Sequence, residues 1–124
     1  EHGSFSWFEY GAKNREAAIK FFEEVMGWES QTNPMGEMLY TLFMKDGEMI
    51  AGLYDLPESM GDVPAHWLPY FEVANIDNSL AIVVEQDGKI LMPKMDVENV
   101  GHFAVIQDSA GAVCGLLQSK PMDC

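Results

Sequence analysis

The sequence predicts an α+β fold built from two tandem βαβββ modules. Two stretches, SWFEYGAKNREAAIKFFEEVMGW and WLPYFEVANIDNSLAIVVEQDGK, each run from an aromatic-rich strand into a helix that starts after Asn and stops at Gly. A hairpin-rich segment follows each stretch, and a connection containing Pro and Gly lies at the midpoint of the 124 residues. Repetition of this kind indicates a duplicated unit. We expect the two modules to form a curved, mixed eight-stranded sheet with the helices on its outer face.

The two halves match at a nearly constant spacing. Asn14 and Asn75 lie 61 residues apart, and Gly52 and Gly115 lie 63 residues apart. The spacing grows by single residues at the turns, where insertions are tolerated best. Both spacings are odd, so corresponding residues keep the same grouping on strand faces.

The first module is predicted over residues 5–55. Asn14 is a suitable N-cap and Gly27 a suitable C-terminal stop for the helix between them. The dipeptide Asp46-Gly47 is typical of a two-residue hairpin turn. The predicted elements are a strand at 5–11, a helix after Asn14, and strands at 28–32, 38–45 and 48–54.

The second module is predicted over residues 67–118, after a connection at 56–66 that is rich in Pro, Gly and acidic residues. Its predicted elements are a strand at 67–73, a helix at 76–86, and strands at 89–95, 102–107 and 112–118. We therefore expect one domain over residues 5–118. A sheet of this kind leaves its inner face for a ligand, because the helices cover only the outer face.

The composition excludes several classes of partner. Seven basic residues against 20 acidic residues give a net charge of −13, which repels nucleic acid and anionic membranes. No apolar run approaches the roughly 20 residues of a membrane span. The two cysteines do not suggest a disulfide framework, and the first residues lack the features of a signal peptide. We expect a cytoplasmic protein.

Three segments resemble the vicinal oxygen chelate superfamily, which includes glyoxalase I, bleomycin-resistance proteins and extradiol dioxygenases. They are REAAIKFFEEVMGWE, PAHWLPYFEVANID and VGHFAVIQDSAGAVCGLLQ. The last is similar to the F-x-DPxGN-x-x-x-L element of that superfamily, with Asp108 and Gly111 as its turn residues. The likeness covers residues 5–118 and is greatest for the glyoxalase-like branch. It implies the paired-module fold, but one fold hosts many reactions.

The resemblance also implies where metal ligands would lie. Metal-dependent members place a His or Glu on four strands, and these positions fall on Trp7, Leu68, Gly115, and at or next to Gly52. None of these side chains is an imidazole, carboxylate or thiolate, the groups that ligate divalent metals. A shift of two residues brings in Glu9 and Tyr70, which is still not a full ligand set. We expect no metal and no other cofactor.

The candidate ligand-binding residues are polar and aromatic side chains near the strands that begin or close the modules. They are Trp7, Glu9, His66, Trp67, Tyr70, Glu72 and His102. Glu9 shares a strand face with Trp7, and Glu72 shares one with Tyr70. Carboxylates buried together in an apolar hollow repel each other, so at least one pKa rises and acid/base chemistry becomes available. The alternative interpretation, solvated carboxylates near a rim, stays open.

The histidines and the other aromatic residues each have two interpretations. His66 and His102 lack HxH or HxxxH spacing, so they are expected to be capping or rim groups, or hydrogen-bond donors to a polar ligand. Alternation sends half of the strand aromatics to the core and half to the hollow, where they suit a planar or apolar ligand.

Three functions are compatible with the sequence. The first is binding of a small organic molecule without metal. The second is an enzyme, which by the resemblance is a glyoxalase- or dioxygenase-like lyase, isomerase or oxidoreductase using a metal or an acid/base carboxylate. The third is an interaction module whose hollow is filled by its own side chains. Superfamily members commonly pair, so we also expect a homodimer.

Overall fold

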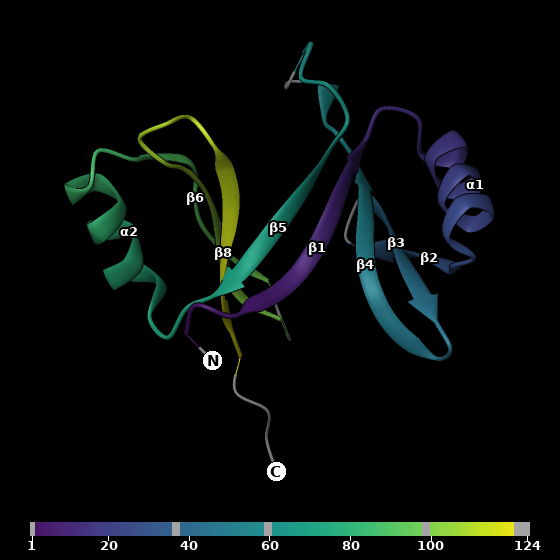
Figure 1. Ribbon diagram of the computed structural model, residues 1–124, viewed down its shortest axis with the longest axis horizontal. Coiled ribbons are helices and arrows are strands. Elements are labelled where there is room, and N and C mark those ends of the chain that lie inside the picture. The colour runs from purple at the N-terminus through teal and green to yellow at the C-terminus, as the bar shows by residue number, and fades with distance from the viewer. Residues whose placement is uncertain (1, 36–37, 59–60, 98–99, 121–124) are drawn as a thin grey trace. The chain divides into compact units, whose positions relative to one another are not determined.

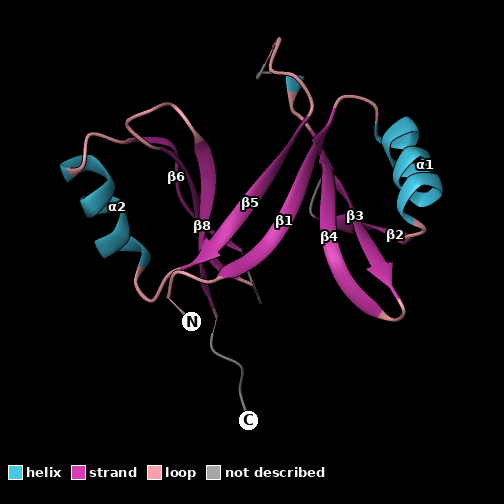
Figure 2. Cartoon of the chain, in the orientation of Figure 1, coloured by secondary structure: helices cyan, strands magenta, loops and turns pink. Residues whose placement is uncertain are grey.

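The computed structural model describes residues 2–35, 38–58, 61–97 and 100–120. It contains eight strands and two helices in the order β1, α1, β2 to β4, β5, α2, β6 to β8 (Figure 1). This order is βαβββ repeated twice, as the colouring by secondary structure makes clear (Figure 2). The predicted fold class, tandem βαβββ modules with mixed strand pairing, is confirmed.

Every predicted element is present, with boundaries that move by three residues at most. The first module consists of β1 (Phe5–Ala12), α1 (Arg15–Met26), β2 (Glu29–Met35), β3 (Met38–Lys45) and β4 (Glu48–Asp55). The second consists of β5 (His66–Glu72), α2 (Ile76–Glu85), β6 (Lys89–Val97), β7 (Gly101–Gln107) and β8 (Val113–Ser119).

Strand pairing confirms the internal repeat. The first module has the order β2-β3-β4-β1 and the second has the equivalent order β6-β7-β8-β5. In each module the first strand runs parallel to the last one, and the other pairs are antiparallel. Glu9 lies opposite Gly52 in the first module, and Tyr70 lies opposite Gly115 in the second. Glu9 and Tyr70 are 61 residues apart, and Gly52 and Gly115 are 63 residues apart, which are the two spacings of the sequence repeat.

The chain divides into two compact units, and their boundary cuts both first strands. The first unit comprises Trp7–Leu68, and the second joins the segment that ends at Ser6 to the chain from Pro69 onward. Backbone hydrogen bonds hold that segment to β5: Gly3 N donates to Glu72 O at 2.7 Å, and Glu72 N donates to Ser4 O at 2.8 Å. The N-terminal residues therefore belong with the second unit.

Helix α1 has the predicted caps. The Asn14 side chain accepts a hydrogen bond from Ala17 N at 3.1 Å, which satisfies one of the free amides of the first turn. Gly27 adopts φ +70°, and its N–H donates to Glu23 O at 3.1 Å. Phe22 is the buried residue of this helix and packs into the core of the first unit.

Helix α2 begins as predicted but ends differently from α1. Asn75 accepts a hydrogen bond from Asn78 N at 3.0 Å. At the other end the left-handed residue is Asp87, with φ +65°, and not the Gly88 that corresponds to Gly27 in sequence. A Cβ at Gly88 would lie 2.8 Å from both Gln107 O and a Val83 methyl, so this glycine is required for space.

The hairpin between β3 and β4 has the predicted two-residue turn. Asp46 and Gly47 have φ values of +52° and +82°, as a type I′ turn requires. Lys45 and Glu48 are the pair that closes it. Farther from the turn the register shifts between Phe43 and Met44, which matters for the site.

Each unit has its own core between its helix and one face of its strands. In the first unit the buried residues are Ala12, Phe22, Phe43, Ala51 and Leu53. In the second they are Val73, Ile76, Ala104 and Leu116. Neither helix, among the residues described, combines the length and apolarity needed to cross a bilayer. Because strand side chains alternate, the residues between these core positions point to the opposite face.

Candidate functional site

The first strand places two sequence-predicted residues on the face opposite its core. Tyr10 and Ala12 pack into the core beside α1. Trp7 and Glu9 therefore project from the opposite face of β1. Both side chains are partly buried, so neither is fully exposed to solvent nor sealed inside.

Strands β3 and β4 bring further aromatic residues to the same face. Ala51 and Leu53 belong to the core, so Gly52 and Tyr54 lie on the other face of β4. Tyr40 pairs with Tyr54 across the two strands. We call Trp7, Glu9, Tyr40 and Tyr54, which gather around Gly52, the Glu9 cluster.

A chain of hydrogen bonds runs through this cluster and ends at the carboxylate. The indole Nε1 of Trp7 donates to Tyr40 Oη at 3.0 Å, and Tyr40 Oη donates to Glu9 Oε2 at 2.7 Å. A hydroxyl that donates to a carboxylate forms a short, charge-assisted bond, and accepting from the indole polarises that hydroxyl further. Trp7 and Tyr40 thus fix the position of the Glu9 carboxylate.

The Glu9 carboxylate also affects the ionisation of Tyr54. Burial raises the pKa of the Tyr54 phenol, and the negative charge of Glu9 raises the pKa further. Tyr54 is therefore a neutral phenol at physiological pH. The cluster consists of one acidic group and three neutral aromatic rings.

Gly52 makes room for the Tyr40 phenol. A Cβ at position 52 would lie 1.6 Å from Tyr40 Oη and 2.3 Å from Cζ. The phenol therefore occupies the space that any side chain at position 52 would need. Glycine inside a strand often marks such a close approach.

The second unit repeats this arrangement with apolar residues. A Cβ at Gly115 would lie 2.4 Å from two ring carbons of Tyr70. The Tyr70 ring also contacts Phe103, with centroids 6.2 Å apart. By strand register Tyr70 corresponds to Glu9, Phe103 to Tyr40, and Leu117 to Tyr54. The carboxylate is therefore found in the first unit alone of the two equivalent positions.

The sequence from residue 4 to residue 114 matches the family described as the Glyoxalase/Bleomycin resistance protein/Dioxygenase superfamily. The chain belongs to this superfamily. The resemblance predicted from the three sequence segments is thus confirmed.

Two curated relatives show the extent of the likeness. "Putative glyoxylase CFP32" of Mycobacterium tuberculosis (strain CDC 1551 / Oshkosh) is 29% identical over 121 residues, which cover 95% of this chain and 46% of that protein. "Anthracycline biosynthesis protein DnrV" of Streptomyces peucetius is 28% identical over 134 residues, covering 98% of this chain and 49% of that protein. The chain spans about half the length of the curated relatives it matches.

Solved structures share the fold. Methylmalonyl-CoA epimerase from Mycobacterium tuberculosis superimposes with a TM-score of 0.67 at 13% identity, covering 95% of this chain and 89% of that one. The hypothetical protein BH1468 from Bacillus halodurans C-125 gives a TM-score of 0.70 at 9% identity, covering 100% and 99%. At such low identity these likenesses show the fold alone.

The residues present do not fit the metal that the superfamily implies. The positions carried over for its ligands fall on Trp7, Leu68, Gly115, and at or next to Gly52, and none of these offers a ligand for a divalent ion. Tyrosine side chains fill the space above both glycines. Among the described residues no three His, Cys, Asp or Glu side chains come close enough to hold an ion.

The hydrogen bonds of Glu72 indicate a structural role. Its carboxylate accepts hydrogen bonds from Ser6 Oγ at 3.2 Å, Ser119 N at 2.8 Å and Ser119 Oγ at 2.6 Å. Burial opposes its ionisation, but the hydrogen bonds from Ser119 and Ser6 outweigh burial and hold the pKa of Glu72 below its usual value. Glu72 therefore ties the N-terminal segment to β8.

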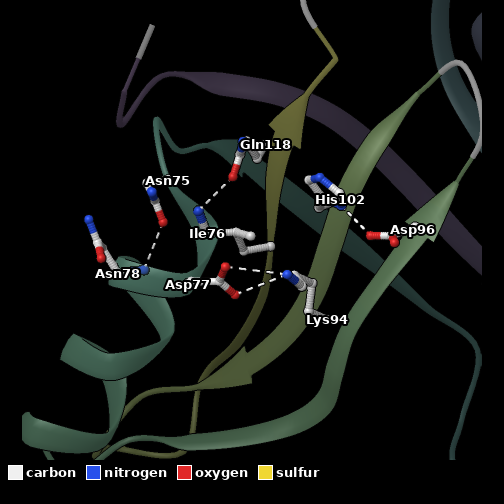
Figure 3. A network of polar contacts seen from close by, with 8 residues as sticks. All are labelled: Asn75, Ile76, Asp77, Asn78, Lys94, Asp96, His102 and Gln118. Carbon is white, nitrogen blue, oxygen red and sulfur yellow. Dashed lines mark hydrogen bonds and ion pairs between the residues drawn. The ribbon is translucent and has the colours of Figure 1, made fainter.

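His102 lies on the helix-covered face of the second unit. It shares a strand face with Ala104, two residues on, which is buried in the core beside α2. Its Nδ1 pairs with Asp96 Oδ1 near the start of α2, where Gln118 Oε1 accepts from Ile76 N at 2.9 Å (Figure 3). The structure does not bring His102 to the face that carries Tyr70.

The residues around the start of α2 are engaged with one another. Lys94 Nζ lies 3.2 Å from Asp77 Oδ1, and Figure 3 shows both oxygens of Asp77 turned toward it. Asp77 is in the first turn of α2, where a negative charge is favourable. These contacts secure the helix to β6 and β8.

Trp67 lies on the core side of the first unit, and His66 contacts the connection that precedes β5. His66 Nδ1 is 2.8 Å from Pro64 O, at the end of the connection. The Trp67 ring packs against Tyr10, Phe22 and Trp28 on the core side of the first unit. Of the seven candidates, the structure brings Trp7 and Glu9 together within the first unit.

A groove of about 340 Å³ lies in the second unit between the end of α2 and the end of β7. Asp108 is the acidic residue that lines it. Its Oδ1 accepts from Ala110 N and Ala112 N at 2.9 and 3.0 Å, so the carboxylate serves the turn between β7 and β8. Gln86, Gln107 and Ser109 also line the groove, and Gln107 Nε2 donates to Gly111 O at 3.0 Å within the same turn.

Sequence reasoning missed Tyr40 and Tyr54. Counting outward from the Asp46-Gly47 turn places Tyr40 opposite Leu53, on a regular ladder. The irregularity beyond Met44 shifts the register by one residue and places Tyr40 opposite Tyr54. The available signal was Gly52 itself, a glycine inside a strand.

Proposed function

We propose that this chain is a glyoxalase/bleomycin-resistance-like protein that binds a small organic molecule at the Glu9 cluster, without a metal. The observation that carries the proposal is the hydrogen-bonded series from Trp7 through Tyr40 to Glu9. A carboxylate held in a fixed position between aromatic rings is a typical arrangement for orienting a ligand.

The burial of the cluster supports a binding role. Trp7, Glu9, Tyr40 and Tyr54 are all partly buried, so a ligand can reach the rings and still displace water from them. Aromatic rings offer large apolar contact areas, and the carboxylate supplies the polar anchor. The equivalent residues of the second unit, Tyr70 and Phe103, are packed against each other.

The chemistry of the ligand positions supports a metal-free state. Restoring a His or Glu at position 52 requires displacement of the Tyr40 phenol, whose oxygen lies 1.6 Å from the place of a Cβ. Purified protein is expected to hold no stoichiometric Zn, Ni, Mn or Fe. Elemental analysis checks this, and about one tightly held ion per chain that is lost on Glu9→Gln contradicts the proposal.

Tryptophan fluorescence tests the binding itself. A ligand near Trp7 should change its emission, and Trp7→Phe should remove that response. Glu9→Gln should weaken ligand binding by about 1.5–3 kcal/mol, the scale of a hydrogen bond to a charged group. The matched control is Glu24→Gln, which removes the same charge from an exposed position on α1.

A contrary result identifies Glu9 as a structural carboxylate. In that case Glu9→Gln melts the fold, and no compound from a broad library changes the fluorescence. The interaction-module hypothesis then takes the place of the binding hypothesis.

An acid/base enzyme is the second candidate. The 2.7 Å hydrogen bond between Tyr40 and Glu9 supports it, because a phenol and a carboxylate at this distance can hold a proton between them. A lyase or isomerase of this kind is expected to exchange carbon-bound hydrogen next to a carbonyl group for deuterium from solvent. Absence of exchange with any ligand that binds removes this candidate.

A further inference from the structure

We infer that the Glu9 cluster recognises an organic cation, an amine or alkylated ammonium group whose nitrogen approaches Glu9 and whose substituents lie against the rings of Trp7, Tyr40 and Tyr54. The inference rests on the proposed function and names the ligand class. It follows from the charge of the cluster, from its aromatic surface and from the contrast between the two units.

The charge of the cluster favours a cation. Its members contribute one carboxylate and three neutral aromatic side chains, since Tyr54 stays protonated beside Glu9. The basic residues that follow β1 are used elsewhere: Lys13 Nζ donates to Gly61 O at 2.7 Å, and Arg15 Nε is 3.3 Å from Asp55 Oδ2. With a net charge of −13, the chain also attracts cations and repels anions over longer distances.

The aromatic rings add selectivity for substituted ammonium groups. The face of an indole or phenol ring is electronegative, so it attracts a cation by about 0.5–2 kcal/mol, depending on how far the cation is desolvated. An alkylated ammonium also gains by placing its methyl groups on the rings. A neutral alcohol gains neither charge term, and a carboxylate is repelled by Glu9.

The Gly52 position ties this recognition to geometry. The Tyr40 phenol stands over Gly52 and donates to Glu9, so its position orients the carboxylate. Tyr40 is in this sense a positioning residue. Gly52→Ala displaces the phenol and removes no charged or aromatic group.

The second unit lacks the same chemistry. Tyr70, Phe103 and Leu117 occupy the positions equivalent to Glu9, Tyr40 and Tyr54. Tyr70 and Phe103 provide rings, and none of the three provides a carboxylate. We therefore expect one cation site per chain.

The test is isothermal titration calorimetry with four probes that share a phenyl ring: benzyltrimethylammonium, benzylamine, benzyl alcohol and benzoate. Both cations should bind about tenfold tighter than benzyl alcohol, a difference of about 1.4 kcal/mol in binding free energy. Benzoate should bind weakest, because Glu9 repels its negative charge. Glu9→Gln should remove the preference for the cations, and Glu24→Gln should leave it unchanged. Added salt should weaken the binding of the cations but not the binding of the alcohol.

Two variants test the positioning role of Tyr40. Tyr40→Phe keeps the ring and removes the hydroxyl, and Gly52→Ala moves the ring. Both should reduce the cation preference severalfold, and circular dichroism confirms that each variant is folded. If Gly52→Ala does not fold, Tyr40→Phe decides the point by itself, because it adds no atoms.

The outcomes separate this inference from the proposed function. If benzyl alcohol or benzoate binds as tightly as the cations and still depends on Glu9, the ligand class is wrong and the binding site stands. If the cation preference survives Glu9→Gln, it comes from the overall charge, and the inference is overturned. If no probe binds at millimolar concentration and a broad library also fails, the proposed function itself is wrong.

Discussion

At Gly52 and Gly115 the absence of a side chain leaves space that another residue fills. In each case a tyrosine ring covers the glycine, Tyr40 over Gly52 and Tyr70 over Gly115. A glycine inside a strand costs about 0.5–1 kcal/mol relative to alanine. Here that cost is offset by packing of an aromatic ring and, at Tyr40, by two hydrogen bonds.

Glu72 illustrates a residue whose environment decides between two roles. It has the same residue type as Glu9 and a similar place on the first strand of its module, yet three hydrogen bonds commit it to Ser6 and Ser119. Glu9 accepts a hydrogen bond from the Tyr40 phenol within an aromatic cluster. The two carboxylates that the sequence suggested as a pair therefore lie in different environments.

The first prediction concerns the pH dependence of stability at Glu72. Its pKa in the folded protein is below the usual value of 4.5, so its stabilisation is complete above that value and is lost as the pH falls through the lowered folded pKa. Glu72→Gln should cost about 1–2 kcal/mol at neutral pH, because an amide cannot accept all three hydrogen bonds. Urea unfolding at pH 7 and pH 3 measures this.

The control for that prediction is Glu29→Gln, which changes an exposed residue on β2. The difference between wild type and Glu72→Gln should shrink at the lower pH, and Glu29→Gln should unfold like wild type at both. A Glu72→Gln difference that is the same at both pH values contradicts the assignment.

At the scale of elements, local signals determine where each helix and hairpin begins and ends. Asn14 and Asn75 cap α1 and α2, and the type I′ turn fixes the start of the β3–β4 register. Equivalent sequence positions do not always have equivalent conformations, since Asp87 and not Gly88 is left-handed at the end of α2. The neighbouring Gln107 backbone explains why glycine is still required at position 88.

The second prediction concerns the hairpin turn. Gly47 has φ +82° and no atom within 4 Å of an added Cβ, so a substitution there is affected by backbone strain and not by crowding. Gly47→Ala should cost about 1–2 kcal/mol, the penalty of a left-handed conformation for an L-residue. Gly47→Asn should cost less, because Asn adopts this conformation more readily. Chemical unfolding of both variants measures the difference, and equal stability of wild type and Gly47→Ala contradicts the prediction.

At the scale of the whole molecule, each unit has its own core, and apolar side chains remain exposed on both helices. Phe21, Val25 and Met26 of α1 are 57%, 58% and 46% exposed, and Ile82 and Val84 of α2 are 54% and 60% exposed. A helix with a second apolar face, besides the one that packs on its own core, usually buries that face against a partner chain.

The third prediction is that the chain forms a homodimer, which we propose on the basis of these exposed residues. Light scattering at micromolar concentration should give twice the mass of the 124-residue chain. Phe21→Ser should shift the equilibrium toward the monomer, and Lys20→Ser, a neighbouring exposed position, should not. A monomeric mass for the unmodified chain contradicts the prediction.

The sequence by itself determined the order of the elements, the repeat and the family. These features depend on local information: side-chain periodicity, Asn caps, glycine stops and the Asp46-Gly47 turn, which act over a few residues. The same local information identified Trp7 and Glu9 as neighbours on one strand face, because alternation along a strand is strict.

Only the tertiary structure decided which strand neighbours complete the site. The register shift after Met44 placed Tyr40 beside Glu9, and the ladder between β7 and β8 placed His102 on the helix-covered face. Contacts between strands distant in sequence depend on register, and a single irregular residue changes every pair beyond it. The register of a strand pair is therefore decided by contacts between the strands and not by local signals alone.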